Sequence, residues 1–187
     1  MNLYKRSQVG VSLLEVLLTL VIVSIAFLGL LGLQMTSLND TNSAYFRSQA
    51  TIVINDMVAR MRSNSAGVVD NRYHDIKSST IKCGDIPVPY CGGYHDGTKY
   101  IPAVSCSSDE MAVYDVFVMS CGVAGNDIIG GVDDLLPSGS MTINCNDADL
   151  ADADVCSETS TFTISVSWIE KIKGKGVKRS TTLTVLP

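Results

Sequence analysis

The chain has 187 residues, a mean hydropathy of +0.24 and a formal net charge of −5. This acidic balance disfavours a protein that binds nucleic acid over its whole surface. The length leaves enough residues beyond the apolar N-terminal segment for one compact domain with its own core.

The first ten residues form a short polar leader, residues 1–10, which carries Lys5 and Arg6, has no acid and ends in Gly10. Basic residues before an apolar segment stay in the cytoplasm, so the rest of the chain is expected to face outward. An ordinary secretory signal has a shorter apolar core and a small-x-small cleavage site, and residues 34–38 offer no such site.

An apolar run of about 23 residues follows, from Val11 to Leu33, which is long enough to span a bilayer. Its one charged residue is Glu15. A charge in a bilayer-spanning helix costs about 2.5–3.5 kcal/mol, so a plain uncleaved anchor would leave Glu15 unexplained. We therefore expect Glu15 to have a function.

Leader, glycine, apolar residue and glutamate together resemble the class III signal of type IV pilins and pseudopilins. The resemblance implies that prepilin peptidase cleaves after Gly10, that Val11 becomes the N-methylated first residue, and that Glu15 docks against the terminal amine of a neighbouring subunit. Two departures are visible: Val11 stands where the family most often has Phe, and the run lacks the helix-bending Pro of many major pilins. The second departure predicts a straighter helix.

The helix is predicted to continue to Ala66, with residues 11–35 as its transmembrane half and residues 36–66 as an amphipathic half. Apolar residues recur there at helical spacing, and Gly67 is a plausible stop. The polar stretch Thr36 to Ser43 could be irregular. The apolar face comprises Phe46, Ala50, Val53, Met57 and Met61, with Arg47, Gln49, Asn55, Asp56, Arg60 and Arg62 on other faces.

The stretch RSQAT…DMVARMRSN, within residues 47–64, resembles the corresponding segment of the PilV group of minor pilins. The groups Met111–Asp115 and Leu135–Ser140 resemble a helix start and a turn of the same group. Taken without the resemblance, the first stretch is an amphipathic helix with solvated arginines.

Residues 67–187 are expected to form a disulfide-stapled head. Residues 68–105 lack periodicity and are predicted to be a loop region, pinned by Cys83 and Cys91. Ser107 or Ser108 can cap a helix that runs to Val118 or Cys121, with acids in its first turn. A short strand is predicted from Met141 to Cys145.

The C-terminal part gives the clearest strand, because Phe162, Ile164, Val166 and Trp168 alternate with polar residues. A Lys/Gly turn at residues 173–176 reverses the chain into a strand whose apolar-leaning face holds Thr181, Leu183 and Val185. The prediction is an α+β fold, the type IV pilin fold, in which a long N-terminal helix packs on a small antiparallel sheet.

The six cysteines lie outside the apolar run, and an even count on the outward side indicates disulfides in an oxidising compartment. The sequence does not fix their pairing, although Cys145 and Cys156 flank one loop and are favoured as one pair. The candidates are Cys83, Cys91, Cys106, Cys121, Cys145 and Cys156.

Few residues point to catalysis, metal binding or cofactor binding. His74 and His95 have no nucleophile motif nearby, and the cysteine spacing does not match a zinc site. The acids from Asp147 to Asp154 could bind calcium but lack the EF-hand spacing, so solvated loop acids are the better interpretation. We expect no enzyme activity, no metal and no cofactor.

The basic C-terminal hairpin (Lys171, Lys173, Lys175, Lys178 and Arg179) could contact DNA phosphates, but a solvated turn or an edge-strand gatekeeper is favoured.

The resemblance implies a minor pilin of PilV type. Such a protein starts in the inner membrane with its head in the periplasm and joins other minor and major pilins in the type IV pilus. Through the pilus, the family contributes to twitching motility, adhesion or DNA uptake. Two alternatives remain open: a minor pseudopilin of a type II secretion system, and a membrane-anchored enzyme of the cell envelope.

Overall fold

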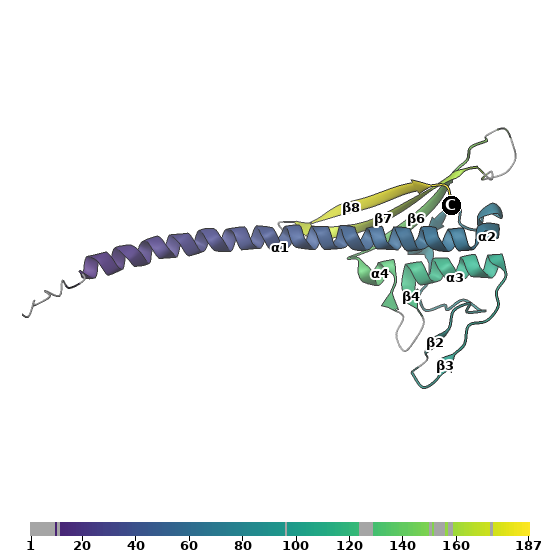
Figure 1. The fold of residues 1–187 in the computed structure, drawn as a ribbon, viewed down its shortest axis with the longest axis horizontal. Helices are drawn as coiled ribbons and strands as arrows, with labels where there is room; N and C mark the ends of the chain where they lie inside the picture. Colours follow the sequence, from purple (N-terminus) through teal and green to yellow (C-terminus); the bar gives the residue numbers. More distant parts are fainter. Residues whose placement is uncertain are drawn as a thin grey trace, which may run out of the picture. The chain divides into compact units, whose positions relative to one another are not determined.

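Figure 1 shows the fold of the protein in the computed structural model. The structure describes residues 10, 12–95, 97–123, 129–149, 151, 156, 159–172 and 174–187, with residue 129 as backbone only. The leader residues 1–9 and Val11 lie outside the described residues. The chain divides into two units, Met1–Asn42 and Ser43–Pro187. From here on, "head" means the second unit, which holds the predicted head together with the preceding residues from Ser43 onward.

One helix, α1, runs from Leu13 to Ser63 without a break, so the predicted irregularity at Thr36 to Ser43 is wrong. The hydroxyls of Thr36 and Thr41 donate to the carbonyls of Gly32 and Ser37, four residues earlier, at 3.2 and 2.8 Å. These polar side chains therefore bond back onto the helix instead of competing with it.

The long helix ends at Ser63, three residues before its predicted last residue, Ala66. Asn64 opens a short second helix, α2 (Ser65–Val69), and its side-chain oxygen accepts from the N–H of Gly67. Gly67 lies inside α2, where a Cβ would meet the Asn64 amide nitrogen at 2.6 Å. This glycine therefore permits a close contact and does not terminate the first helix.

The main sheet has four strands: β1 (Ile76–Lys77), β6 (Ser140–Asn146), β7 (Thr161–Ile172) and β8 (Lys175–Val185). It is antiparallel, with strand order β1–β6–β7–β8. The predicted strands at Met141–Cys145 and Phe162–Trp168 are both present within longer elements.

The described head also contains short elements that the sequence does not predict. They are two strand pairs, β2 (Tyr94–His95) with β3 (Tyr100–Ile101) and β4 (Gly122–Val123) with β5 (Ile129–Gly130), and two short helices, η1 (Ser78–Thr80) and α4 (Val132–Leu135).

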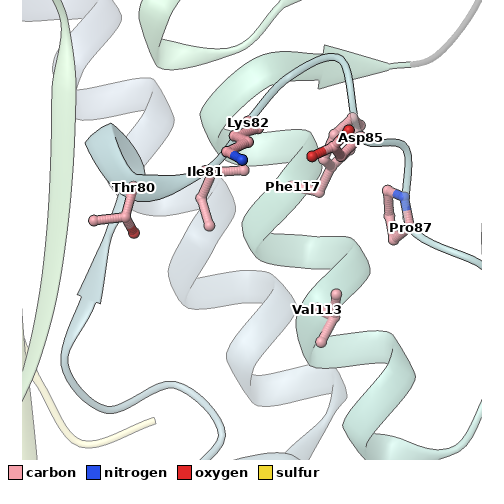
Figure 2. A pocket seen from close by; sticks show the side chains of 7 residues that line it. All are labelled: Thr80, Ile81, Lys82, Asp85, Pro87, Val113 and Phe117. Atoms are coloured by element: carbon pink, nitrogen blue, oxygen red, sulfur yellow. The ribbon is translucent and has the colours of Figure 1, made fainter.

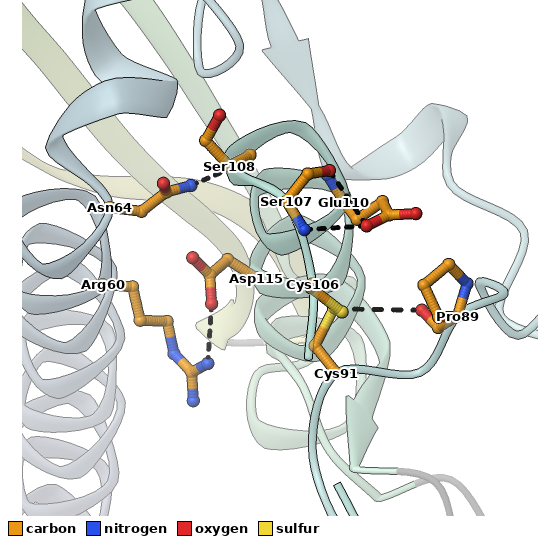
Figure 3. Close-up of a disulfide and its surroundings, with 9 residues drawn as sticks. All are labelled: Arg60, Asn64, Pro89, Cys91, Cys106, Ser107, Ser108, Glu110 and Asp115. Atoms are coloured by element: carbon orange, nitrogen blue, oxygen red, sulfur yellow. Dashed lines mark hydrogen bonds and ion pairs between the residues drawn. A yellow bond between two sulfur atoms is a disulfide. The ribbon is translucent and has the colours of Figure 1, made fainter. Parts of the chain in front are cut away.

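Helix α3 (Ser108–Cys121) begins where the sequence predicts. Ser107 is its N-cap, and Ser107 and Glu110 form a reciprocal capping box (Figure 3). The hydrogen bonds from Ser107 lower the pKa of the Glu110 carboxyl below its usual range. Two otherwise unpaired backbone donors at the helix start are satisfied in this way.

The core of the head lies between the C-terminal part of α1 and the sheet. The predicted helix face is confirmed, because Ala50, Val53, Met57 and Met61 are buried and Phe46 packs against them. The alternation in β7 is confirmed too, and Trp168 is 2% exposed. In β8, Leu183 lies opposite Ile164 but stays 38% exposed, because β8 is an edge strand with no neighbour beyond it.

Candidate functional site

Every described residue before Ser43 is exposed in the isolated chain, although most of these residues are apolar. Leu13 is 88% exposed and Leu33 is 72% exposed. The helix contains an 18-residue window of mean hydropathy 2.8, long and apolar enough to cross a membrane. A helix that is apolar on all sides needs lipid or other apolar helices around it.

The hydroxyls of this apolar segment are satisfied within the helix. Thr19 donates to the carbonyl of Val16 at 2.9 Å, and Ser24 donates to that of Leu20 at 2.7 Å. Neither of these two hydroxyls therefore needs a hydrogen-bond partner outside the helix. The helix can thus lie in a lipid environment, where no water is present to accept such a bond.

Glu15 lies in the first turn of α1, where the helix dipole favours a negative charge. Ser12 precedes the helix, its carbonyl accepts from the Glu15 N–H at 3.0 Å, and its hydroxyl accepts from Leu14 N–H at 3.3 Å. Glu15 is the one charged residue of the described segment before Asp40. Gly10 is exposed with open space around its Cα, while Val11 lies outside the described residues.

A buried polar network joins α1 to α3 in the head (Figure 3). Asp115 is 3% exposed; it accepts from Arg60 Nη1 at 3.0 Å and from the Tyr73 hydroxyl at 2.7 Å. Asn64 Nδ2 donates to the Tyr73 oxygen at 3.0 Å and to the Ser108 carbonyl at 2.8 Å. The network therefore fixes the crossing of the two helices through directional bonds.

Burial shapes the ionisation of this network. Burial raises the pKa of Asp115, and the hydrogen bonds from Tyr73 and Arg60 offset this only in part. The pKa of Tyr73 is also raised, first by burial and then by its bond to Asp115. For Arg60, burial lowers the pKa, but the bond to Asp115 and the nearby acids raise it by more. Arg60 therefore stays a cation and compensates the buried acid.

The amphipathic pattern of the sequence does not predict this network. It predicts a solvated Arg60, whereas the Arg60 side chain is 26% exposed and bonded to Asp115. One signal was available: Asp115 is a lone acid beside the apolar run Val116–Met119, on a helix that must bury that run. A buried acid needs a donor, and Arg60 is a donor on a neighbouring helix.

A second buried carboxylate ties α1 to the sheet. Glu170 in β7 is 6% exposed and accepts from Trp168 Nε1 at 2.9 Å and from the Ser43 hydroxyl at 3.2 Å. Arg179 in β8 lies 3.5 Å from it. Ser43 is the first residue of the head, so Glu170 anchors the point at which the chain enters the head.

All six cysteines are paired, and none is free among the described residues. Cys145 pairs with Cys156, as the sequence favours. Cys83 pairs with Cys121 and Cys91 with Cys106, so the loop region is held to α3 and to itself. Figure 3 shows the Cys91–Cys106 bond just before the N-terminus of α3.

The head has a surface cavity of about 420 Å³ beside α3, lined mainly by apolar side chains (Figure 2). Its one hydroxyl, Thr80, donates to the Lys77 carbonyl at 2.8 Å, and no histidine or cysteine lines the cavity. His74 accepts from the Cys145 N–H and His95 from the Gly97 N–H, so the two lie in separate local contacts. The structure does not bring either histidine to the cavity.

Among the described residues, no group of three His, Cys, Asp or Glu side chains is placed to hold a metal ion. The predicted acidic loop Asp147 to Asp154 lies partly outside the described residues. Asp147 accepts from the Ser160 hydroxyl at 3.1 Å, and Asp149 accepts from the N–H of Ala151 at 2.9 Å.

Comparison with known families gives one match. Residues 32–117, somewhat under half of the chain, match the Tt1218-like family, described as type IV pilin Tt1218. The matched stretch starts in the apolar part of α1 and ends within α3. No curated protein and no solved structure matches the chain. The family match and the long N-terminal helix packed on a small antiparallel sheet together support a type IV pilin.

Proposed function

We propose that the protein is a minor pilin of PilV type. Prepilin peptidase removes residues 1–10, Val11 becomes the methylated N-terminus, and residues 11–35 hold the protein in the inner membrane with its head in the periplasm. The subunit then joins the type IV pilus or the complex that primes its assembly. Its contribution to twitching motility, adhesion or DNA uptake is made through the filament.

The observation that carries this proposal is the exposed apolar part of α1 with its single carboxylate, Glu15. An apolar helix cannot stay exposed to water, and both a bilayer and a bundle of like helices would cover it. Glu15 can neutralise a neighbouring terminal amine, which is costly to leave unpaired away from water. The mechanism is packing and charge pairing between subunits.

The head supports this role through rigidity. Three disulfides close its loops. Two buried polar networks join α3 and the sheet to the C-terminal part of α1. A subunit extracted from a membrane and moved into a filament needs a head that stays folded during transfer. Disulfides supply that stability without a large core.

The test is mass spectrometry of the envelope form and of sheared pili. The expected result is a chain that starts at Val11, carries one methyl group and is present in the pilus fraction. Replacing Gly10 with a bulky residue should leave the leader attached. A mature N-terminus at Met1 or beyond Leu33 would contradict the proposal, and loss of protein secretion without loss of pili in a deletion strain would favour a pseudopilin.

A further inference from the structure

The C-terminal hairpin concentrates positive charge in an acidic protein. From Lys171 to Pro187 the sequence has five basic residues and no acid, while the whole chain has a net charge of −5. Four of these basic residues are described: Lys171, Lys175, Lys178 and Arg179. The pilin proposal gives this cluster no role.

The hairpin lysines are available for a partner. Lys171, Lys175 and Lys178 are exposed, and none of them has an ion pair among the residues that the structure describes. Two exposed apolar side chains belong to the same hairpin, one on each of its faces. Ile169, 41% exposed, is opposite Lys178, and Ile172, 39% exposed, is opposite Lys175. The tip thus combines unpaired cations with exposed isoleucines.

The hairpin tip lies at the end of the head where the chain enters it. Glu170 bonds to Ser43, the first residue of the head, and β7 ends two residues later at Ile172. The other end of β7 is far along the head: Phe162 pairs with Cys145, whose N–H donates to His74, beyond the end of α1. β7 therefore runs toward Ser43.

Chain length limits the distance between this end of the head and the apolar segment. Ser43 follows Met35, where the proposed transmembrane half ends, by eight residues, which span about 12 Å as a helix and at most about 29 Å when fully extended. The strand advances only about 7 Å from Glu170 to the end of β7. The lysines are therefore within reach of the surface of any bilayer that holds residues 11–35.

We propose that the tip of the β7–β8 hairpin binds the anionic headgroups of phospholipids in that same membrane. The inference rests on the proposed membrane anchoring of the apolar segment. Each lysine near an anionic surface favours the bound state by about fivefold, and exposed isoleucines can enter the interface between headgroups and acyl chains. The contact would hold the head down on the membrane before assembly and release it when the subunit is extracted.

The experiment is lysine acetylation of the full chain in lipid nanodiscs, read by mass spectrometry. Zwitterionic discs are compared with discs that contain phosphatidylglycerol. Acetylation of Lys171, Lys175 and Lys178 should be at least about fivefold slower in the anionic discs, while Lys77, Lys82 and Lys99 serve as internal controls. At 0.5 M salt, where screening acts within about 4 Å, the protection should disappear.

A pair of double variants tests whether the cluster acts together. Lys171→Gln with Lys175→Gln should reduce the protection of Lys178, and Lys77→Gln with Lys82→Gln, which removes the same charge elsewhere, should not. Equal acetylation in the two kinds of disc overturns the inference. Stronger protection of the hairpin by a short DNA duplex than by anionic lipid also overturns it, in favour of a nucleic-acid contact.

The two proposals fail in different ways. A chain that does not insert into either disc overturns the proposed function and this inference with it. A chain that inserts but whose hairpin lysines stay unprotected overturns the inference alone.

Discussion

Arg60 on α1 and Asp115 on α3 form an ion pair at 3.0 Å, and the carboxylate end of the pair is almost completely buried. The two residues are 55 positions apart in sequence. Their bond, supported by Tyr73 and Asn64, joins the long helix to the part of the head that carries the disulfide-closed loops. Removing Arg60 leaves the Asp115 carboxylate in a site that water hardly reaches, whereas Arg60 itself is 26% exposed.

Arg60→Ala should lower the free energy of unfolding by about 3 kcal/mol, because it leaves a buried acid without its cation. The estimate is at the low end of the range because Tyr73 still donates to Asp115. The fluorescence of Trp168, the only tryptophan and a buried one, reports unfolding of the head in detergent solution. Arg62→Ala is the matched control, since Arg62 is exposed; equal losses for the two variants would contradict the role of the pair.

The defect of Arg60→Ala should depend on pH. The pKa of Asp115 is already raised by burial, and losing Arg60 removes a contribution that lowers it. A carboxyl with a raised folded-state pKa destabilises the fold when ionised, and this penalty is relieved as pH falls through the folded-state pKa. The stability gap between variant and wild type should therefore narrow from pH 7 toward about pH 4, near the unfolded-state pKa of aspartate. A gap that widens on acidification would contradict this assignment.

The disulfides should differ in their contribution to stability. Cys83–Cys121 spans 38 residues, whereas Cys145–Cys156 spans 11. Loop-closure entropy predicts a loss of about 4 kcal/mol for replacing the first pair with serine and about 3 kcal/mol for the second. Thermal unfolding of the two double variants measures the order, and thiol titration of the native protein should find no free cysteine. A larger loss for the short loop would show that strain or packing outweighs chain entropy.

The fold follows from local patterns in this sequence. The spacing of Ala50, Val53, Met57 and Met61 and the alternation from Phe162 to Trp168 each reflect one buried face, so periodicity alone predicts the helix and the strand. The start of α3 was predictable because Ser107 and Glu110 have the spacing of a capping box. Each of these signals lies within a few residues of the element that it specifies.

Other features depend on contacts between distant residues, which periodicity does not encode. Arg60 and Asn64 resemble ordinary polar residues until α3 brings Asp115 and Ser108 beside them. The pairings of Cys83 and Cys91 depend on the path of the loop region. The sequence predicts Gly67 as the stop of the first helix, whereas Asn64 already ends that helix and caps the next. The roles of Gly10, Val11 and Glu15 concern partners outside this chain, so they remain predictions.

Glu15→Ala should leave insertion and leader cleavage intact but reduce the amount of protein in the pilus. In the bilayer the substitution removes a charge that costs about 2.5–3.5 kcal/mol, so the monomer is not harmed. In the filament it removes the group that would neutralise a neighbour's terminal amine, and with it the preference for one axial position of the helices. Glu15→Gln should have an intermediate effect, because an amide can accept a hydrogen bond from the amine but carries no charge to neutralise it.

The measurement for Glu15 is the ratio of each variant in sheared pili to the same variant in the membrane pool, with the N-terminus of both pools checked by mass spectrometry. Thr19→Ala is a matched control, because Thr19 lies one turn further along the same exposed helix and its hydroxyl bonds only within that helix. It should reach the pilus at the wild-type ratio. A subunit at the filament tip has fewer neighbours than one in the shaft, so a partial loss for Glu15→Ala is the expected size of the effect. Wild-type ratios for both Glu15 variants would mean that contacts of the head, and not the charge in the apolar segment, recruit this subunit.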